Sequence, residues 1–375
     1  MFPLQELPLI IQALIASVFG LIVGSFLNVV IYRVPQGESI AFPASHCGSC
    51  GKAVKPYDNI PLLSYAILRG RCRFCKETYS WRYPAVELLV GLLFFAVVYQ
   101  NGLTWLSIAQ VIFVAIIVAL TFIDAEHFLL PDVITYPALL FAIVSTMAIS
   151  FWMAWNDLPW ITIRSWLPPS IAGSHFPYWF GLVAIALAVP TLWLVDRIEN
   201  VLFGKYFEFT EEEETEADRK LNEKWEKQRR QVIFFILILG VIAQIVWWFA
   251  AWKRIQPATI VASYTLLQSI VGAIIGGGVV WVLRAAFFYL RGIEGMGLGD
   301  IKLMAVIGAF LGWDVALLVI FFGTLLGSIV GGIAALRSKE GMKLRLPFGL
   351  PLGISAILAI FYGHSLIQWY VQMLP

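Results

Sequence analysis

Long apolar runs separated by short polar stretches set the pattern of this chain. A membrane-spanning helix needs about 20 apolar residues, and runs of that order recur at residues 7–31, 84–99, 105–123, 133–152, 178–195, 232–252, 259–283 and 348–371. A further run, 303–336, is too long for one span, and we expect it to break at 312–314 into a short helix and a full one. The pattern predicts an all-α polytopic membrane protein, a bundle of about 8–10 transmembrane helices.

Composition supports a membrane protein and argues against several other classes. The chain is 60% hydrophobic and 13% charged, whereas an ordinary soluble domain carries about 25% charged residues. Its net charge is only +2 and it has no dense basic stripe, so we expect no nucleic-acid partner. The lipid bilayer is therefore the predicted surroundings of most of the chain.

The distribution of charge predicts the orientation of the helices. No Lys or Arg precedes the first apolar run, which therefore lacks the basic start of a signal peptide and is expected to stay as a helix. Basic residues outnumber acidic ones in 32–82 and in 337–345, which places both segments in the cytoplasm. Alternating the spans from an outside N-terminus brings the turns at Asp124 and Asp300 to that same face.

The polar block after the first run contains the only four cysteines of the chain, which are Cys47, Cys50, Cys72 and Cys75. They form two C-x2-C pairs, and four thiolates complete a tetrahedral zinc shell. Such a shell has no open position, so the zinc is expected to be structural. It would stabilise a segment that is too small to form a hydrophobic core of its own. Redox chemistry or an iron–sulfur cluster are the alternatives.

Two acids stand at the edges of apolar runs. Asp124 ends one run, and Asp300 follows Gly297 and Gly299 in a G-x-G-D motif. Two carboxyl groups held close together cannot both ionise, so one can take a proton from water while the other donates to a peptide carbonyl. The glycines leave room for an extended substrate. The alternative is that both acids are helix caps or solvated loop residues.

Several segments together resemble one known family. They are residues 24–35, the two cysteine pairs, 59–65, 82–87, 123–132, 295–302 and 346–349. In this order they resemble the bacterial prepilin peptidases, which are the type IV leader peptidases of the GxGD membrane aspartic proteases. The resemblance spans nearly the whole chain and implies a multi-pass protein of the bacterial cytoplasmic (inner) membrane, with its active site facing the cytoplasm.

The resemblance implies roles for particular residues. Asp124 and Asp300 match the catalytic pair, and four neighbours match supporting positions, namely Gly297, Gly299, Lys302 and Asp132. The substrates implied are prepilins or pseudopilins, whose short basic leader is removed. Members with the cysteine loop often also methylate the new N-terminal residue with S-adenosylmethionine, and Gly70 matches a position linked to methylation.

The chain departs from the family in the long separation of its two acids. The excess fits an insertion at 153–256, with two extra spans and a charged cytoplasmic segment at 196–230. This insertion either contacts pilus or type II secretion machinery or only extends the bundle. The other expected segments are the first transmembrane helix at 1–33, the zinc-binding cytoplasmic domain at 34–83, helices with the first catalytic acid at 84–152, and helices with the GxGD motif at 257–375.

Two alternatives to a bifunctional peptidase stay open on the sequence alone. One is a peptidase that no longer methylates its product. The other is a non-enzymatic membrane scaffold or transporter subunit with a zinc loop, which would not need Asp124 or Asp300.

Overall fold

The computed structural model describes residues 3–155, 256–291, 297–337 and 347–373. Its elements are η1 (Pro3–Glu6), α1 (Leu9–Arg33), η2 (Pro56–Asp58), α2 (Leu63–Leu68), α3 (Arg82–Asn101), α4 (Trp105–His127), α5 (Asp132–Trp155), α8 (Gln256–Arg291), α9 (Leu298–Leu311), α10 (Trp313–Arg337) and α11 (Gly349–Met373). The expected spans at 178–195 and 232–252 and the charged segment 196–230 lie outside the described residues.

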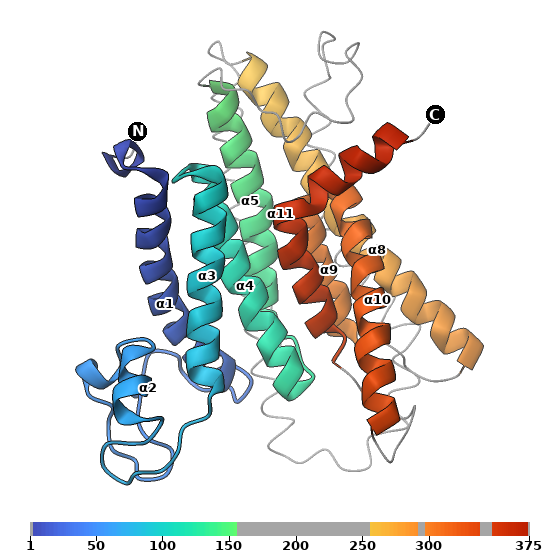
Figure 1. Ribbon diagram of the computed structural model, residues 1–375. Coiled ribbons are helices and arrows are strands. Elements are labelled where there is room, and N and C mark those ends of the chain that lie inside the picture. Colours follow the sequence, from blue (N-terminus) through green and yellow to red (C-terminus); the bar gives the residue numbers. More distant parts are fainter. Residues whose placement is uncertain (1–2, 156–255, 292–296, 338–346, 374–375) are drawn as a thin grey trace.

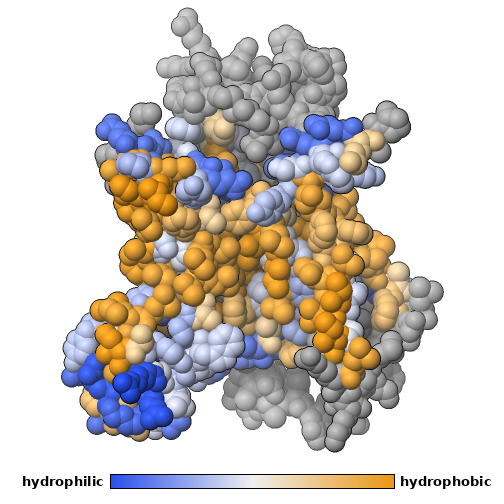
Figure 2. Space-filling model, viewed as in Figure 1, coloured by the Kyte–Doolittle hydropathy of each residue, from blue (hydrophilic) through white to orange (hydrophobic). Residues whose placement is uncertain are grey.

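Seven of the described helices are long and apolar enough to cross a membrane: α1, α3, α4, α5, α8, α10 and α11. They cover every span that the sequence predicts within the described part of the chain. Figure 2 shows the result on the surface, where an apolar band crosses the middle of the molecule and hydrophilic residues gather at its two ends. The protein is a helical, multi-pass membrane protein, as predicted.

The predicted break in the long C-terminal apolar run is confirmed. Helix α9 ends at Leu311, Gly312 adopts a positive φ of 91°, and α10 begins at Trp313. A positive φ is costly for residues other than glycine, so Gly312 is suited to the turn between the two helices. The 14 residues of α9 rise only about 21 Å, which is too short to cross a hydrocarbon core of about 30 Å.

Helix α4 joins two parts of the bundle. On one side Val114, Val118 and Ile123 pack in a buried cluster with α1 and α3. On the other side Phe113 and its neighbours pack in a second cluster with α5, α9, α10 and α11. The Phe113 ring stacks on Phe310 with the ring centroids 4.1 Å apart. Because α4 belongs to both cores, the two clusters fix its position within the bundle.

Glycines allow the neighbouring helices to approach closely. A Cβ atom on Gly24 of α1 would lie 2.7 Å from the Glu87 Cα of α3. On α10, a Cβ atom on Gly323 would lie 2.6 Å from the Leu352 side chain of α11, and one on Gly327 would lie 3.3 Å from the Phe348 ring, just before α11. These two glycines therefore allow α10 to pack closely against the start of α11.

The cysteine-containing segment forms a small loop domain between α1 and α3. It lies at the lower end of the bundle in Figure 1, and α2 is its one α-helix. Within this described segment the backbone pairs only in two isolated antiparallel bridges, His46 with Ala53 and Arg71 with Thr78. A segment with so little regular structure needs another source of order.

Candidate functional site

The two acids singled out in the sequence lie at the same end of the bundle. Asp124 is in the last turn of α4 and Asp300 is in the first turn of α9, near the end that carries the loop domain (Figure 1). Phe128 takes a left-handed conformation and its N–H donates to the Asp124 carbonyl, which ends α4 there. The two acidic residues are only 6% and 5% exposed, which excludes solvated loop acids.

Asp124 is bound by the start of another helix. The Gly349 N–H, at the start of α11, donates to Asp124 Oδ2 over 2.8 Å. The first N–H groups of a helix have no partner within it and favour negative charge beside them. A Cβ atom on Gly349 would lie only 2.6 Å from Asp124 Oδ2, so a glycine is needed for this approach.

Asp300 accepts a hydrogen bond from its own glycine motif. The Gly297 N–H donates to Asp300 Oδ2 over 3.1 Å, which satisfies one backbone donor just before α9. Burial, together with the smaller effect of the nearby charge of Asp124, raises the pKa of Asp300 to about 7. The capping interpretation is therefore correct for one hydrogen bond, but it does not explain a carboxyl group buried beside a second one.

The two glycines of the G-x-G-D motif have different surroundings. A Cβ atom on Gly299 would lie 2.9 Å from the Leu130 side chain. The segment after α4 therefore occupies the space that a side chain at residue 299 would need. A Cβ atom on Gly297 would find Asp300 Oδ2 at 3.7 Å and no closer atom among the described residues. Gly299 is thus required for packing, whereas Gly297 keeps the space beside Asp300 open.

The two predicted supporting side chains Lys302 and Asp132 bind each other. Lys302 Nζ lies 2.6 Å from Asp132 Oδ1, and it also lies over the Tyr136 ring, 5.7 Å from its centroid. This pair joins the starts of α5 and α9. His127, which lies near Asp124 in the sequence, has an exposed side chain.

The four cysteines converge as the sequence predicts. Their Sγ atoms all lie within 4.8 Å of one another, and those of Cys47 and Cys75 are 3.7 Å apart. Tetrahedral zinc with Zn–S bonds of about 2.3 Å holds its sulfurs about 3.8 Å apart. The donor set and its spacing therefore fit one zinc ion.

The two cysteine knuckles have the same backbone pattern. The Cys47 N–H donates to the Lys52 carbonyl, and the Cys72 N–H donates to the Glu77 carbonyl. Backbone hydrogen bonds from Cys75 and Phe74 lower the pKa of the Cys72 thiol to about 6. Stabilised thiolates are the form that a metal binds, so the loop is prepared for an ion.

Gly70 lies immediately before the second knuckle in a left-handed conformation. Its φ is +67°, and a Cβ atom there would lie 2.9 Å from the ring of Tyr65. The Tyr65 hydroxyl donates to the Tyr79 carbonyl over 3.3 Å. Gly70 therefore allows the second knuckle to pack closely against α2.

Comparison with known proteins agrees with these features. Residues 18–101 match the bacterial peptidase A24 N-terminal domain, and residues 229–332 match the type IV leader peptidase family. The prepilin leader peptidase/N-methyltransferase of Aeromonas hydrophila is 29% identical, over 94% of this chain and 91% of its own length. The chain belongs to the type IV leader peptidase family.

Other members of the family are similar over different lengths. The prepilin leader peptidase/N-methyltransferase of Neisseria gonorrhoeae is 26% identical over 95% of this chain and 94% of its own length. The protein of the same name from Myxococcus xanthus (strain DK1622) is 50% identical, but only over 34% of this chain and 38% of its own length. No solved structure gives a significant match.

One feature of this leader peptidase site was not predicted from the sequence. Gly349 belongs to a segment that carries the family resemblance, yet nothing in its local sequence indicates a partner. The structure places its N–H on Asp124. A glycine at the start of an apolar helix, directly after a proline and a phenylalanine, is the only signal that the sequence offered.

Proposed function

We propose that this protein is a membrane aspartic endopeptidase that removes the leader of type IV prepilins or pseudopilins and then methylates the new N-terminal residue. The observation that carries the peptidase proposal is the buried pair Asp124 and Asp300, in which the charge of Asp124 helps to raise the pKa of Asp300. The names of the relatives, which combine both activities, support methylation.

The surroundings of the two carboxyl groups support a division of roles. Asp300, with its pKa raised to about 7 by burial and by Asp124, keeps a proton up to about neutral pH. Asp124, which accepts the Gly349 N–H, takes a proton from the attacking water. The water oxygen bonds to the peptide carbon, and the carbonyl oxygen accepts the proton of Asp300. The C–N bond then breaks as the leaving amine takes the proton held by Asp124, and a hydroxyl of the tetrahedral intermediate returns a proton to Asp300.

Neighbouring residues are proposed to hold this pair in place. The Lys302–Asp132 ion pair fixes the start of α9 relative to α5. Gly299 lets Leu130 pack against the motif, and Gly297 leaves space for the substrate backbone. These are positioning roles, because none of these residues takes part in the proton transfers.

The proposed orientation follows from charge. The basic loop domain is at the same end of the bundle as the two acids (Figure 1), and basic segments face the cytoplasm. We place the protein in the bacterial inner membrane with its active site at the cytoplasmic face. The apolar substrate segment can then stay in the bilayer while its leader is cut in water.

Two small ligands complete the proposal. The loop domain would hold one zinc ion through Cys47, Cys50, Cys72 and Cys75, and this ion would fix the two knuckles without reacting. S-adenosylmethionine supplies an electrophilic methyl group when it is bound. The loop domain and the adjoining ends of α1 and α3 are proposed to provide the methylation site, with Gly70 shaping it.

The insertion at 153–256 is proposed to be an addition to the catalytic core, and the second family match begins within it, at residue 229. An even number of extra spans leaves the following helix on its original face. Pilus or type II secretion machinery is its proposed partner.

A cleavage assay with a prepilin-like substrate in liposomes tests the peptidase proposal. We expect the wild type to remove the leader, and Asp124→Asn and Asp300→Asn to lose cleavage while staying folded. Normal cleavage by both variants would refute the aspartic mechanism. Mass spectrometry of the new N-terminus, with and without S-adenosylmethionine, separates a bifunctional enzyme from one that only cleaves.

A further inference from the structure

A cavity of about 190 Å³ lies where the loop domain meets α1 and α3, and neither Asp124 nor Asp300 lines it. Its lining includes Asn28 of α1, Glu87 of α3 and Gly70 of the loop domain. Asn28 and Glu87 are 3% and 8% exposed. The mechanism of leader cleavage uses neither residue.

Asn28 has a buried acceptor without a partner. Its Nδ2 group donates to the Gly24 carbonyl over 3.3 Å and to the Tyr83 carbonyl over 3.1 Å. Its Oδ1 atom has no hydrogen-bond partner among the residues that the structure describes. Leaving a buried acceptor unpaired costs about 1–3 kcal/mol, so this atom favours a ligand that donates an N–H or O–H group.

Glu87 brings a carboxylate to the same cavity. Its Oε2 atom accepts the Leu62 N–H over 2.8 Å, and within the described part of the chain it makes no ion pair. Gly24 lies against the Glu87 backbone, and Asn28, one turn further along α1, donates to Tyr83, one turn before Glu87 on α3. Both side chains line the same cavity. Two acceptors and no paired cation make this part of the cavity complementary to an amino group.

The basic side chains that also line the cavity lie towards solvent. Arg73 pairs with Asp58 at 2.5 Å, and Lys52 lies over the Phe74 ring, 4.7 Å from its centroid. Arg71 is exposed. Within the described structure none of these side chains bonds to Glu87, so its charge is available to a ligand.

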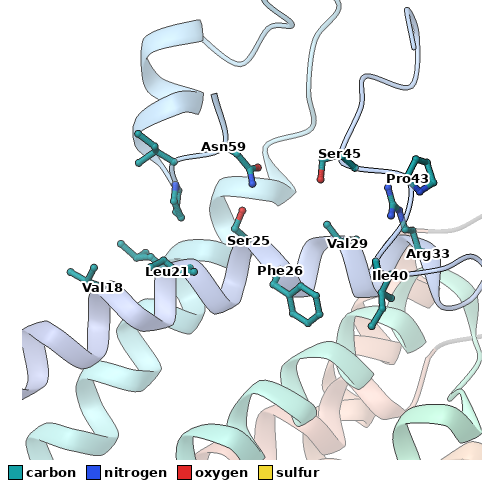
Figure 3. Close-up of a pocket in the computed structure, with 15 residues that line it drawn as sticks. Val18, Leu21, Ser25, Phe26, Val29, Arg33, Ile40, Pro43, Ser45 and Asn59 are labelled. Carbon is teal, nitrogen blue, oxygen red and sulfur yellow. The ribbon is translucent and has the colours of Figure 1, made fainter. Parts of the chain in front are cut away.

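A larger groove of about 630 Å³ adjoins the cavity along α1. The two share Ser25, Val29 and Asn59 in their linings. Figure 3 shows Ser25 pointing towards the segment that carries Asn59, with Val18 and Leu21 further along the same helix. The groove is therefore continuous with the cavity and runs from it along an apolar helix face.

The apolar side chains along the groove indicate which kind of ligand would carry the amino group. Val18, Ile22 and Phe26 line it at four-residue spacing on α1 and are 60%, 55% and 50% exposed. Ile40 and Ile60 line it from the loop domain and are also exposed. An apolar peptide segment lying along α1 in the membrane would cover these side chains.

We propose that Asn28 Oδ1 and Glu87 bind the free N-terminal amine of the cleaved substrate, whose apolar segment lies in the groove along α1. This inference rests on the proposed function, because it locates the acceptor of methyl transfer. The amine would give up a proton to Glu87, and its lone pair would form the new N–C bond. The S–C bond of S-adenosylmethionine breaks, and its electron pair stays on sulfur.

A binding experiment with the full-length protein in detergent tests this proposal. The probe is a synthetic peptide that begins with a free-amine Phe and continues with an apolar segment, and its control is the same peptide with an acetylated N-terminus. We expect the wild type to bind the free amine at least about tenfold more tightly, as for hydrogen bonds to a charged group. Glu87→Gln should abolish that preference.

Matched variants separate binding from folding. Glu87→Gln retains a side-chain oxygen that can accept the Leu62 N–H, so the contact between α3 and the loop domain is kept. Glu77→Gln removes an exposed acid of the same loop domain and should leave the preference at the wild-type value. Asn28→Leu should also reduce the preference, and thermal unfolding shows whether each variant is folded.

Two outcomes would overturn the proposal. One is an unchanged preference for the free amine in folded Glu87→Gln protein. The other is that Asn28→Leu weakens the binding of S-adenosylhomocysteine but not that of methylthioadenosine, which lacks the amino-acid moiety, and leaves the preference for the free-amine peptide unchanged. That result would assign the cavity to the methyl donor. Because the peptide needs no cleavage, failure of the peptidase proposal leaves this test intact and is distinguishable from it.

Discussion

The backbone N–H of Gly349 donates to Asp124 Oδ2 over 2.8 Å, although the two residues belong to different helices and are far apart in the chain. This bond fixes one carboxyl oxygen of Asp124 and leaves the other for water. It also makes the start of α11 part of the proposed active site. The apolar helix α11 is therefore more than a membrane anchor.

We expect Gly349→Ala to lower leader cleavage by about 10- to 100-fold, because a hydrogen bond to a charged group contributes about 1.5–3 kcal/mol. The added Cβ atom would stand 2.6 Å from Asp124 Oδ2 and push the two groups apart. The value of kcat/KM for a prepilin-like substrate measures the effect. Gly278→Ala is the matched control, since its Cβ atom meets nothing within 4 Å. Equal losses in both variants would contradict the proposed role of Gly349.

The protonated state of Asp300 predicts a pH limit on cleavage. Burial, with a further contribution from Asp124, raises the pKa of Asp300 to about 7. The proton is present below that value and is lost as the pH rises through it, so kcat should fall above about pH 7. The measurement is a pH profile of kcat at saturating substrate. Thermal unfolding at each pH is the control, and a kcat that stays level up to pH 9 in folded protein would show that Asp300 is not the acid.

The two motif glycines should respond differently to alanine. Gly299→Ala places a Cβ atom 2.9 Å from Leu130, and overpacking of this kind costs about 1–3 kcal/mol. Gly297→Ala has room in the unliganded protein and should keep its stability while impairing substrate binding and cleavage. Thermal unfolding together with KM and kcat measures both effects. Equal stabilities of the two variants would contradict this difference in packing.

Loss of the metal should affect methylation more than cleavage. A structural zinc ion contributes about 10–16 kcal/mol in small domains, so the loop domain should lose its order when Cys50→Ser and Cys72→Ser are combined. We expect elemental analysis to find one zinc ion per chain in the wild type and almost none in the variant. Methylation should then be lost while leader cleavage is retained in part. Iron in place of zinc would favour the iron–sulfur alternative.

Local patterns were enough to predict much of the architecture. Each described span corresponds to an apolar run, because the bilayer requires a fixed length of apolar helix whatever its neighbours are. The break at Gly312 was visible because the run was too long for one span. The cysteine site could be predicted because each C-x2-C pair forms a tight turn that directs both thiols to one ion. The structure contains two such turns with the same backbone hydrogen bonds, and their four Sγ atoms converge.

The sequence by itself determined which residues could do chemistry, and the tertiary structure decided how they are arranged. Nothing near Asp124 in the chain indicates Gly349, and nothing near Asn28 indicates Glu87. Gly297 and Gly299 are the same residue type in the same motif, yet only Gly299 has a neighbour, Leu130, in the space that a side chain would occupy. These relationships depend on contacts between helices that are distant in sequence, and such contacts arise from close packing of whole surfaces and not from any local periodicity.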